Sequence, residues 1–226
     1  MKCRNKIILA LDVDNRKEAM RWVNLLYPKV SVFKVGLKLY TACGPEIITA
    51  IRKKGAQVFL DLKFNDIPNT MAGAVKEALK YRVGMLTVHA LAGPEALKAV
   101  AAVARGSRTK ILGVTLLTSI CGHFLKGLGI MRSVSDEVLY LAKMAKRCGL
   151  DGIVSSAQEA KMVRSSLGKN FIIVTPGIRP GKFSSGDQKR VTTPQEAIKA
   201  GADFLVIGRP VLEARDPVAV LKELSG

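Results

Sequence analysis

The chain has few of the residues on which several kinds of active site depend. Its two histidines, His89 and His123, exclude a histidine-rich metal site and argue against a Ser-His-Asp triad. The four cysteines are scattered with no C-x-x-C pair, which indicates reduced thiols in the cytoplasm and no metal site. No apolar run reaches the roughly 18 residues that span a bilayer, so we expect no membrane partner.

Acidic residues are also scarce, since 18 Asp and Glu stand against 36 Lys and Arg and give a formal net charge of +18. Such an excess first suggests nucleic-acid binding. The basic residues are spread over the chain, however, and dense groups such as residues 52–54 and 146–147 fall where helices are expected to end and where cations complement the helix dipole. We therefore expect anionic small-molecule substrates and no nucleic-acid partner, with a basic nucleic-acid-binding protein as an alternative.

Short, nearly continuous apolar runs alternate with amphipathic segments along the chain, which is typical of parallel strands covered on both faces. Eight such units indicate an α/β fold, a (β/α)8 TIM barrel, with a doubly wound sheet as the alternative. No composition shift or linker divides the sequence, so residues 1–226 are expected to form a single domain. The predicted strands are residues 7–13, 32–36, 58–63, 85–90, 111–117, 152–156, 171–175 and 204–208.

Capping signals mark the starts of several predicted helices. Asn15, with Glu18 three residues later, predicts one start. Thr193 begins a capping box with proline at the first helical position, which predicts another. Ser135 precedes the apolar stripe of a helix that Gly149 is expected to end.

Two predicted connections, residues 118–134 and 176–193, are long. They follow the fifth and seventh strands, on the side of a barrel where active sites are found. Their glycine, serine and lysine content suits loops that close over a substrate.

The most informative segment is FLDLKFNDIPNT, residues 59–70. It places Asp61, Lys63 and Asp66 close together at the end of an apolar run. Because side chains alternate along a strand, Asp61 and Lys63 are expected to point to the same face. Desolvated charges need partners, so this group is costly as structure alone and indicates a site that acts on a substrate. A surface ion pair at a strand end is the alternative explanation.

Other predicted strands also end in polar residues, which on a closed barrel face one cavity. The segments TPGIRPG and VIGRPV each combine glycines with an arginine, and they predict a phosphate site after the last two strands. His89 is expected to be a packed strand-end residue rather than a catalytic acid. The polar residues and glycines at these strand ends are Asp12, Lys34, Asp61, Lys63, His89, Thr118, Ser119, Gly177, Arg179, Gly208 and Arg209.

These segments together resemble the orotidine 5′-phosphate decarboxylase family. The resemblance covers nearly the whole chain, and the signature that contains DIPNT is its most specific part, because related sugar-phosphate decarboxylases share the bare D-x-K-x-x-D pattern. The other matching segments are LALDVDN, FKVGLKLY, VHALAG, GVTLLTS, LDGIVSSAQEA, VTPGIRP and GDQKRVTTPQEAIKAGADFLVIGRPV.

The resemblance also implies which residues act. Lys34, Asp61, Lys63 and Asp66 would form a charged catalytic network, with Asp66 reaching into the site of the other subunit of a homodimer. Asp12 would bind ribose, and residues after the seventh and eighth strands would hold phosphate. The implied substrate-binding residues are Asp12, Lys34, Asp61, Ile67, Pro68, Asn69, Thr70, Thr118, Arg179, Gln188, Gly208 and Arg209.

The implied reaction is the loss of CO2 from orotidine 5′-monophosphate without metal or cofactor, giving UMP in pyrimidine biosynthesis. Lys63, kept cationic by Asp61 and Asp66, would stabilise the negative charge left on the ring carbon and then protonate it. The nearest alternative is a 3-keto-gulonate 6-phosphate decarboxylase, which needs Mg2+. The DIPNT and GDQKRVTTP segments argue against it.

Overall fold

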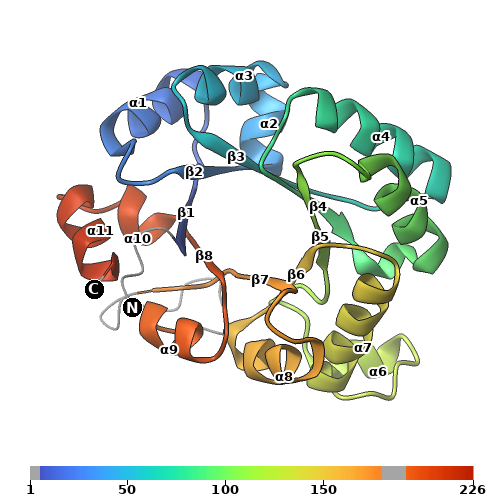
Figure 1. Cartoon of the computed structure of the whole chain (residues 1–226). Coiled ribbons are helices and arrows are strands. Elements are labelled where there is room, and N and C mark those ends of the chain that lie inside the picture. Colours follow the sequence, from blue (N-terminus) through green and yellow to red (C-terminus); the bar gives the residue numbers. More distant parts are fainter. Residues whose placement is uncertain (1–5, 180–191, 226) are drawn as a thin grey trace.

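Eight parallel strands form a closed barrel, and helices surround it (Figure 1). The computed structural model describes residues 6–179 and 192–225. The strands follow one another around the barrel in sequence order, and β1 pairs with β8 to close it. The predicted (β/α)8 barrel is therefore confirmed. The strands are β1 (Ile7–Ala10), β2 (Val32–Gly36), β3 (Gln57–Phe64), β4 (Met85–His89), β5 (Lys110–Val114), β6 (Gly152–Val154), β7 (Ile172–Thr175) and β8 (Phe204–Ile207).

The helices connect successive strands and cover the outside of the barrel (Figure 1). In the part of the chain that the structure describes, every helix is too short or too polar to cross a bilayer. The helices are α1 (Arg16–Leu26), α2 (Leu37–Cys43), α3 (Glu46–Lys53), α4 (Pro68–Lys80), the 3-10 helix η2 (Ala90–Ala92), α5 (Pro94–Ala104), α6 (Gly122–Gly127), α7 (Val134–Arg147), α8 (Ala157–Leu167), α9 (Pro194–Lys199), α10 (Arg209–Leu212) and α11 (Pro217–Ser225).

Local capping interactions explain where several helices begin. The Asn15 side chain accepts the predicted hydrogen bond at the start of α1, and Thr193 forms the predicted capping box at the start of α9. Ser133 rather than Ser135 caps α7, because its Oγ accepts a hydrogen bond from the Asp136 N–H at 3.1 Å. Ser135 lies inside the first turn of that helix.

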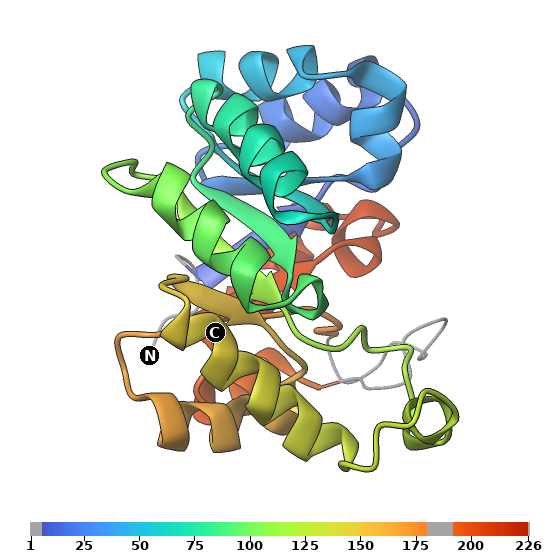
Figure 2. The same cartoon turned by 90° about the vertical axis from the view of Figure 1, so that its right-hand side faces the viewer.

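Two further features differ from the sequence prediction. The connection 118–134 contains a short helix, α6, which stands out from the body of the barrel (Figure 2). Glycines at both ends and the lack of a side-chain cap leave this helix without a sequence signal. In addition, β1, β5 and β6 end at residues 10, 114 and 154, short of the predicted 13, 117 and 156. The predicted strand ends rest on the apolar runs, but apolar residues indicate burial rather than pairing. In these three places the buried residues continue beyond the last residue that pairs with a neighbouring strand.

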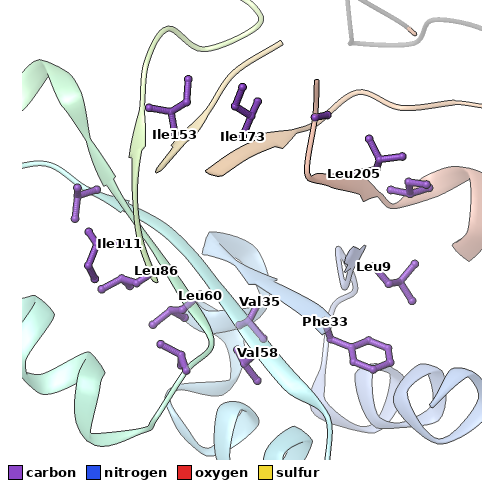
Figure 3. Close-up of a cluster of buried hydrophobic side chains, with 14 of the residues drawn as sticks. Leu9, Phe33, Val35, Val58, Leu60, Leu86, Ile111, Ile153, Ile173 and Leu205 are labelled. Carbon is purple, nitrogen blue, oxygen red and sulfur yellow. The ribbon is translucent and has the colours of Figure 1, made fainter. Parts of the chain in front are cut away.

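Side chains alternate between the outside and the inside of the barrel along each strand. The outward set packs against the helices, and Figure 3 shows members from all eight strands, such as Phe33 and Leu60. The inward set fills the interior of the barrel. Its members are Ile8, Ala10, Phe59, Met85, Leu112, Val174 and Val206, and Val32 packs against them. Lys34, Asp61 and Thr87 come two residues after Val32, Phe59 and Met85, so they also point inward.

Candidate active site

A cavity of about 380 Å³ opens at the carboxyl ends of the strands. Its walls combine apolar side chains of the barrel interior, such as Phe59 and Val206, with polar groups that follow the strands. This volume suits a small-molecule ligand. The predicted site residues that line the cavity are Asp12, Lys34, Asp61, Lys63, Thr118, Arg179, Gly208 and Arg209.

Four charged side chains form a chain of alternating charge in this cavity. Lys63 Nζ donates a hydrogen bond to Asp61 Oδ1 at 3.0 Å. Lys34 Nζ lies 3.5 Å from Asp61 Oδ2 and 3.6 Å from Asp12 Oδ1. Asp61 therefore sits between two ammonium groups. Mutual pairing of this kind offsets the cost of removing charges from water.

Asp61 is held in its ionised form. It is only 8% exposed, and burial by itself raises the pKa of a carboxyl group. The pKa of Asp61 is nevertheless lowered, because Lys34 and Lys63 lie close and because Lys63 and Thr87 donate hydrogen bonds to the carboxylate. A fixed negative charge thus lies beside the Lys63 side chain.

The backbone at Lys63 departs from a regular strand. Its φ angle is +51°, a left-handed conformation that is uncommon for a residue with a Cβ. The pairing of β3 with β4 shifts register between Leu60 and Phe64. The side chains of Asp61 and Lys63 both line the cavity, as predicted. They reach it through a bulge rather than through an undistorted strand.

Two arginines and two glycines gather after β7 and β8, where a phosphate site was predicted. Gly177 has φ +77°, which favours glycine. Arg179 is 8% exposed, and its backbone N–H donates a hydrogen bond to the backbone carbonyl of Thr192 at 3.1 Å. Gly208 and Arg209 follow β8 directly. Both arginines line the cavity, so its positive charge on this side attracts an anionic group.

Comparison with known proteins identifies the family to which this arrangement belongs. Residues 5–224 match the model of the Orotidine 5′-phosphate decarboxylase / HUMPS family. The chain belongs to this family. The family and the carboxy-lyase class that the sequence predicted are therefore confirmed.

Individual relatives of this decarboxylase-family chain support the same assignment. The chain is 46% identical over 222 residues to the orotidine 5′-phosphate decarboxylase of Trichlorobacter lovleyi. These residues cover 96% of this chain and 92% of the relative. It is 47% identical over 221 residues to that of Geotalea daltonii, with 96% and 92% covered. The crystal structure of the Lactobacillus acidophilus orotidine 5′-phosphate decarboxylase superposes with a TM-score of 0.86 at 34% identity, over 97% of both chains.

The DIPNT segment lies outside the cavity of this chain. Asp66 is exposed, and its Oδ1 accepts a hydrogen bond from the Ile67 N–H at 2.7 Å. Ile67 is 67% exposed, and residues 68–70 begin α4. Within the described residues no ion pair joins Asp66 to Lys63, so the role of this segment stays a prediction. Gln188 lies outside the described residues.

Three polar residues of the site were not selected from the sequence. Ser155 and Ser156 line the cavity, and the strand-end pattern of GIVSS could have identified them. Thr87 lies in the apolar run MLTVH and donates a hydrogen bond to Asp61. Only its inward direction, shared with Met85, could have distinguished it.

His89 is packed at the end of β4, as expected. It is half-buried, and its Nδ1 accepts a hydrogen bond from the Leu91 N–H at 3.4 Å. Burial and then the positive charge of Lys63 lower its pKa. His89 is not among the residues that line the cavity.

Proposed function

We propose that this cavity converts orotidine 5′-monophosphate to UMP and CO2 in pyrimidine biosynthesis, with no metal ion or organic cofactor. The observation that carries the proposal is the Lys63–Asp61–Lys34–Asp12 charge chain, in the same cavity as Arg179 and Arg209. The charge chain is suited to act on the pyrimidine ring that reacts, and the two arginines are suited to bind the phosphate. Named relatives that are 46% identical over nearly the whole chain support the same substrate.

In the proposed reaction, the bond between the pyrimidine ring and its carboxylate breaks, and CO2 leaves without the bonding electron pair. That pair stays on the ring carbon, where the Lys63 ammonium stabilises it and then donates a proton to it. Solvent reprotonates Lys63. Asp61 and Lys34 hold the Lys63 side chain in position, because Asp61 bonds both ammonium groups. A fixed arrangement of this kind needs little reorganisation when charge develops.

The remaining predicted residues bind parts of the nucleotide that do not react. Arg179, Arg209 and Gly208 hold the phosphate, together with Gln188, and Thr118 contacts the pyrimidine. Asp12 contacts the ribose hydroxyls, which fits its position beside Lys34 at the edge of the charge chain. Binding energy from the remote phosphate can hold the ring against Lys63.

Asp66 and residues 67–70 act in this proposal on the cavity of a second subunit of a homodimer. Support comes from the exposure of Asp66, Ile67, Asn69 and Thr70, and from the position of the whole segment outside the cavity of its own chain. An isologous dimer would then contain two sites, each completed by one partner carboxylate. A cytoplasmic location also stays a prediction.

The activity is tested by following the loss of orotate absorbance with orotidine 5′-monophosphate in the presence of EDTA. Turnover under these conditions supports the proposal. No turnover of orotidine 5′-monophosphate, with Mg2+-dependent release of CO2 from 3-keto-gulonate 6-phosphate, would favour the sugar-phosphate decarboxylase alternative. No turnover, with salt-sensitive binding to a generic duplex, would favour the nucleic-acid-binding alternative.

The shared site is tested by mixing Lys63→Ala with Asp66→Asn protein under verified subunit exchange. Random mixing gives about half mixed dimers, each with one intact site, and hence about a quarter of wild-type activity. The matched control mixes Lys63→Ala with Lys34→Ala. Both lysines line the cavity of one chain, so that mixture leaves every site incomplete. Recovery in the control, or none in the test, would contradict a shared site.

A further inference from the structure

Thr87 is a buried polar residue that touches two parts of the charge chain without lining the cavity. It lies in β4, points into the barrel and is 0% exposed. Its Oγ1 accepts a hydrogen bond from the Lys63 N–H at 2.9 Å and donates one to Asp61 Oδ1 at 3.0 Å. The same Asp61 oxygen accepts the hydrogen bond from Lys63 Nζ.

The direction of these two hydrogen bonds is fixed by chemistry. A backbone N–H can only donate, so the hydroxyl oxygen must accept from Lys63. An ionised carboxylate can only accept, so the single hydroxyl proton must point to Asp61. Thr87 is therefore hydrogen-bonded both to the backbone of Lys63, the proposed proton donor, and to Asp61, the carboxylate that holds the Lys63 side chain.

The strand geometry explains why a side chain is needed at this place. Leu60 pairs with Leu86, and Phe64 pairs with Val88, so residues 61–63 stand opposite Thr87 alone. The extra residues bulge, and regular backbone pairing is interrupted there. The Thr87 hydroxyl takes the place of a backbone carbonyl as acceptor for the Lys63 N–H. It thereby supports the left-handed Lys63 backbone, which is sparsely populated for such a residue.

We propose that Thr87 is a positioning residue for the decarboxylation, because its hydroxyl holds the Lys63 backbone and the Asp61 carboxylate in register with each other. This inference rests on the proposed function. Loss of the hydroxyl frees the bulge and lets Lys63 Nζ shift relative to the ring carbon. Arg179 and Arg209 stay in place, so nucleotide binding is preserved.

The test compares variants that keep or remove the hydroxyl. Thr87→Val keeps the shape and removes both hydrogen bonds, whereas Thr87→Ser keeps the hydroxyl. We expect kcat to fall by about 10- to 100-fold in Thr87→Val, since a misplacement near 1 Å costs about that much. Affinity for UMP should stay near the wild-type value, and Thr87→Ser should retain most of kcat.

Thr109→Val is the matched control. Thr109 is also buried, at 6% exposure, and its Oγ1 donates to the Val83 carbonyl at 2.7 Å, but it lies just before β5 at the opposite end of the barrel. The Thr109→Val variant loses a hydrogen bond of a buried hydroxyl, as the Thr87→Val variant does. We therefore expect lower stability with unchanged kcat, which separates positioning from stability.

The pH dependence of kcat gives a second readout. The charged groups that face Asp61 are Lys34 from β2 and Lys63 from β3, with Asp12 beyond Lys34. The hydrogen bond from Thr87 helps to lower the pKa of Asp61. Its removal should move the acid limb of the kcat profile of Thr87→Val to higher pH, and Thr109→Val should show no such movement.

Several results would overturn the inference. A folded Thr87→Val protein with wild-type kcat and an unmoved acid limb would do so, and so would an equal loss of kcat in Thr109→Val. If Thr87→Val does not fold, Thr87→Cys decides, because a thiol is a weak donor of similar size. Wild-type kcat in that variant would reject the role of the hydroxyl. A wild-type protein without turnover would instead reject the proposed function.

Discussion

The two ends of the barrel both carry a basic cavity, and they differ in how the charges are used. The carboxyl-end cavity holds about 380 Å³, and its lysines pair with acids. The amino-end cavity is larger, about 820 Å³, and contains Arg52, Arg82 and Arg108. Among the described residues that line it, none is acidic. Volume and positive charge alone therefore do not distinguish an active site from the rest of the barrel.

At the amino end, Arg52 lies in the last turn of α3, and Arg82 follows the end of α4. The Arg52 side chain is half-buried, and its Nη1 donates to the carbonyl of Tyr81 at 2.9 Å and to that of Arg82, where α4 ends. Cations at this position stabilise the negative end of a helix. Part of the excess of basic residues is thus explained by helix ends, as the sequence suggested for Arg52.

The same contrast appears in the backbone. Among the described residues, Lys63 and Arg82 are the non-glycine residues with positive φ, at +51° and +50°. Arg82 follows the last turn of α4, where a left-handed residue commonly ends a helix. Lys63 adopts this conformation inside a strand, next to a buried carboxylate. Unusual backbone conformation indicates function only where the local fold does not already account for it.

The contrast predicts its largest effect at Lys63. Lys63→Ala removes both the proposed proton donor and the cation that stabilises the developing charge, so we expect kcat to fall by about 10,000-fold or more. Arg82→Ala, at the amino end, should leave kcat unchanged. Turnover is measured by orotate absorbance, and UMP binding and thermal unfolding verify that both proteins are folded. Near-normal turnover in a folded Lys63→Ala protein would remove the functional distinction between the two ends.

A smaller effect is expected when an arginine is removed from each cavity. Arg209→Ala should weaken UMP binding by about 1.5–3 kcal/mol, the usual contribution of a hydrogen bond to a charged group. Arg108→Ala, in the amino-end cavity, should not change UMP binding. Calorimetric titration measures both, and uridine without phosphate serves as the comparison ligand. Equal losses for UMP and uridine would show that Arg209 does not act through phosphate.

At the amino end, we expect an effect on stability alone. Arg52→Ala removes the cation that caps α4, and it should lower the free energy of unfolding by about 1–2 kcal/mol. Denaturant titration measures the loss, and kcat of the folded protein should match the wild type. A fall in kcat at full folding would mean that the two ends are coupled.

The smallest effect concerns His89 and pH. Its pKa is lowered in the folded protein below the ordinary value of 6.5, first by burial and then by Lys63. As the pH falls through about 6.5, the unfolded chain takes up a proton that the folded chain does not, so stability declines toward acid. His89→Gln should flatten this decline in unfolding experiments between about pH 7 and 5. A flattening in His123→Gln, at an exposed position on α6, would contradict the assignment to His89.

Much of the fold could be predicted because its signals are local. Apolar runs located all eight strands, and Asn15 and Thr193 were correctly identified as helix caps. The start of α7 was misplaced, because Ser133 and Ser135 are both suitable caps and only the observed hydrogen bond distinguishes them. Helix α6 was missed because its two glycines and uncapped start carry no helical signal.

The sequence by itself determined the barrel and the chemistry of the residues at its carboxyl end, because strand periodicity and strand-end position are encoded in consecutive residues. Only the tertiary structure decided how those residues meet. Lys34 and Asp61 come from neighbouring strands, and their separation of 3.5 Å depends on strand register. The left-handed Lys63 and its bond to Thr87 arise from a bulge between β3 and β4, and a bulge depends on how two distant segments pair.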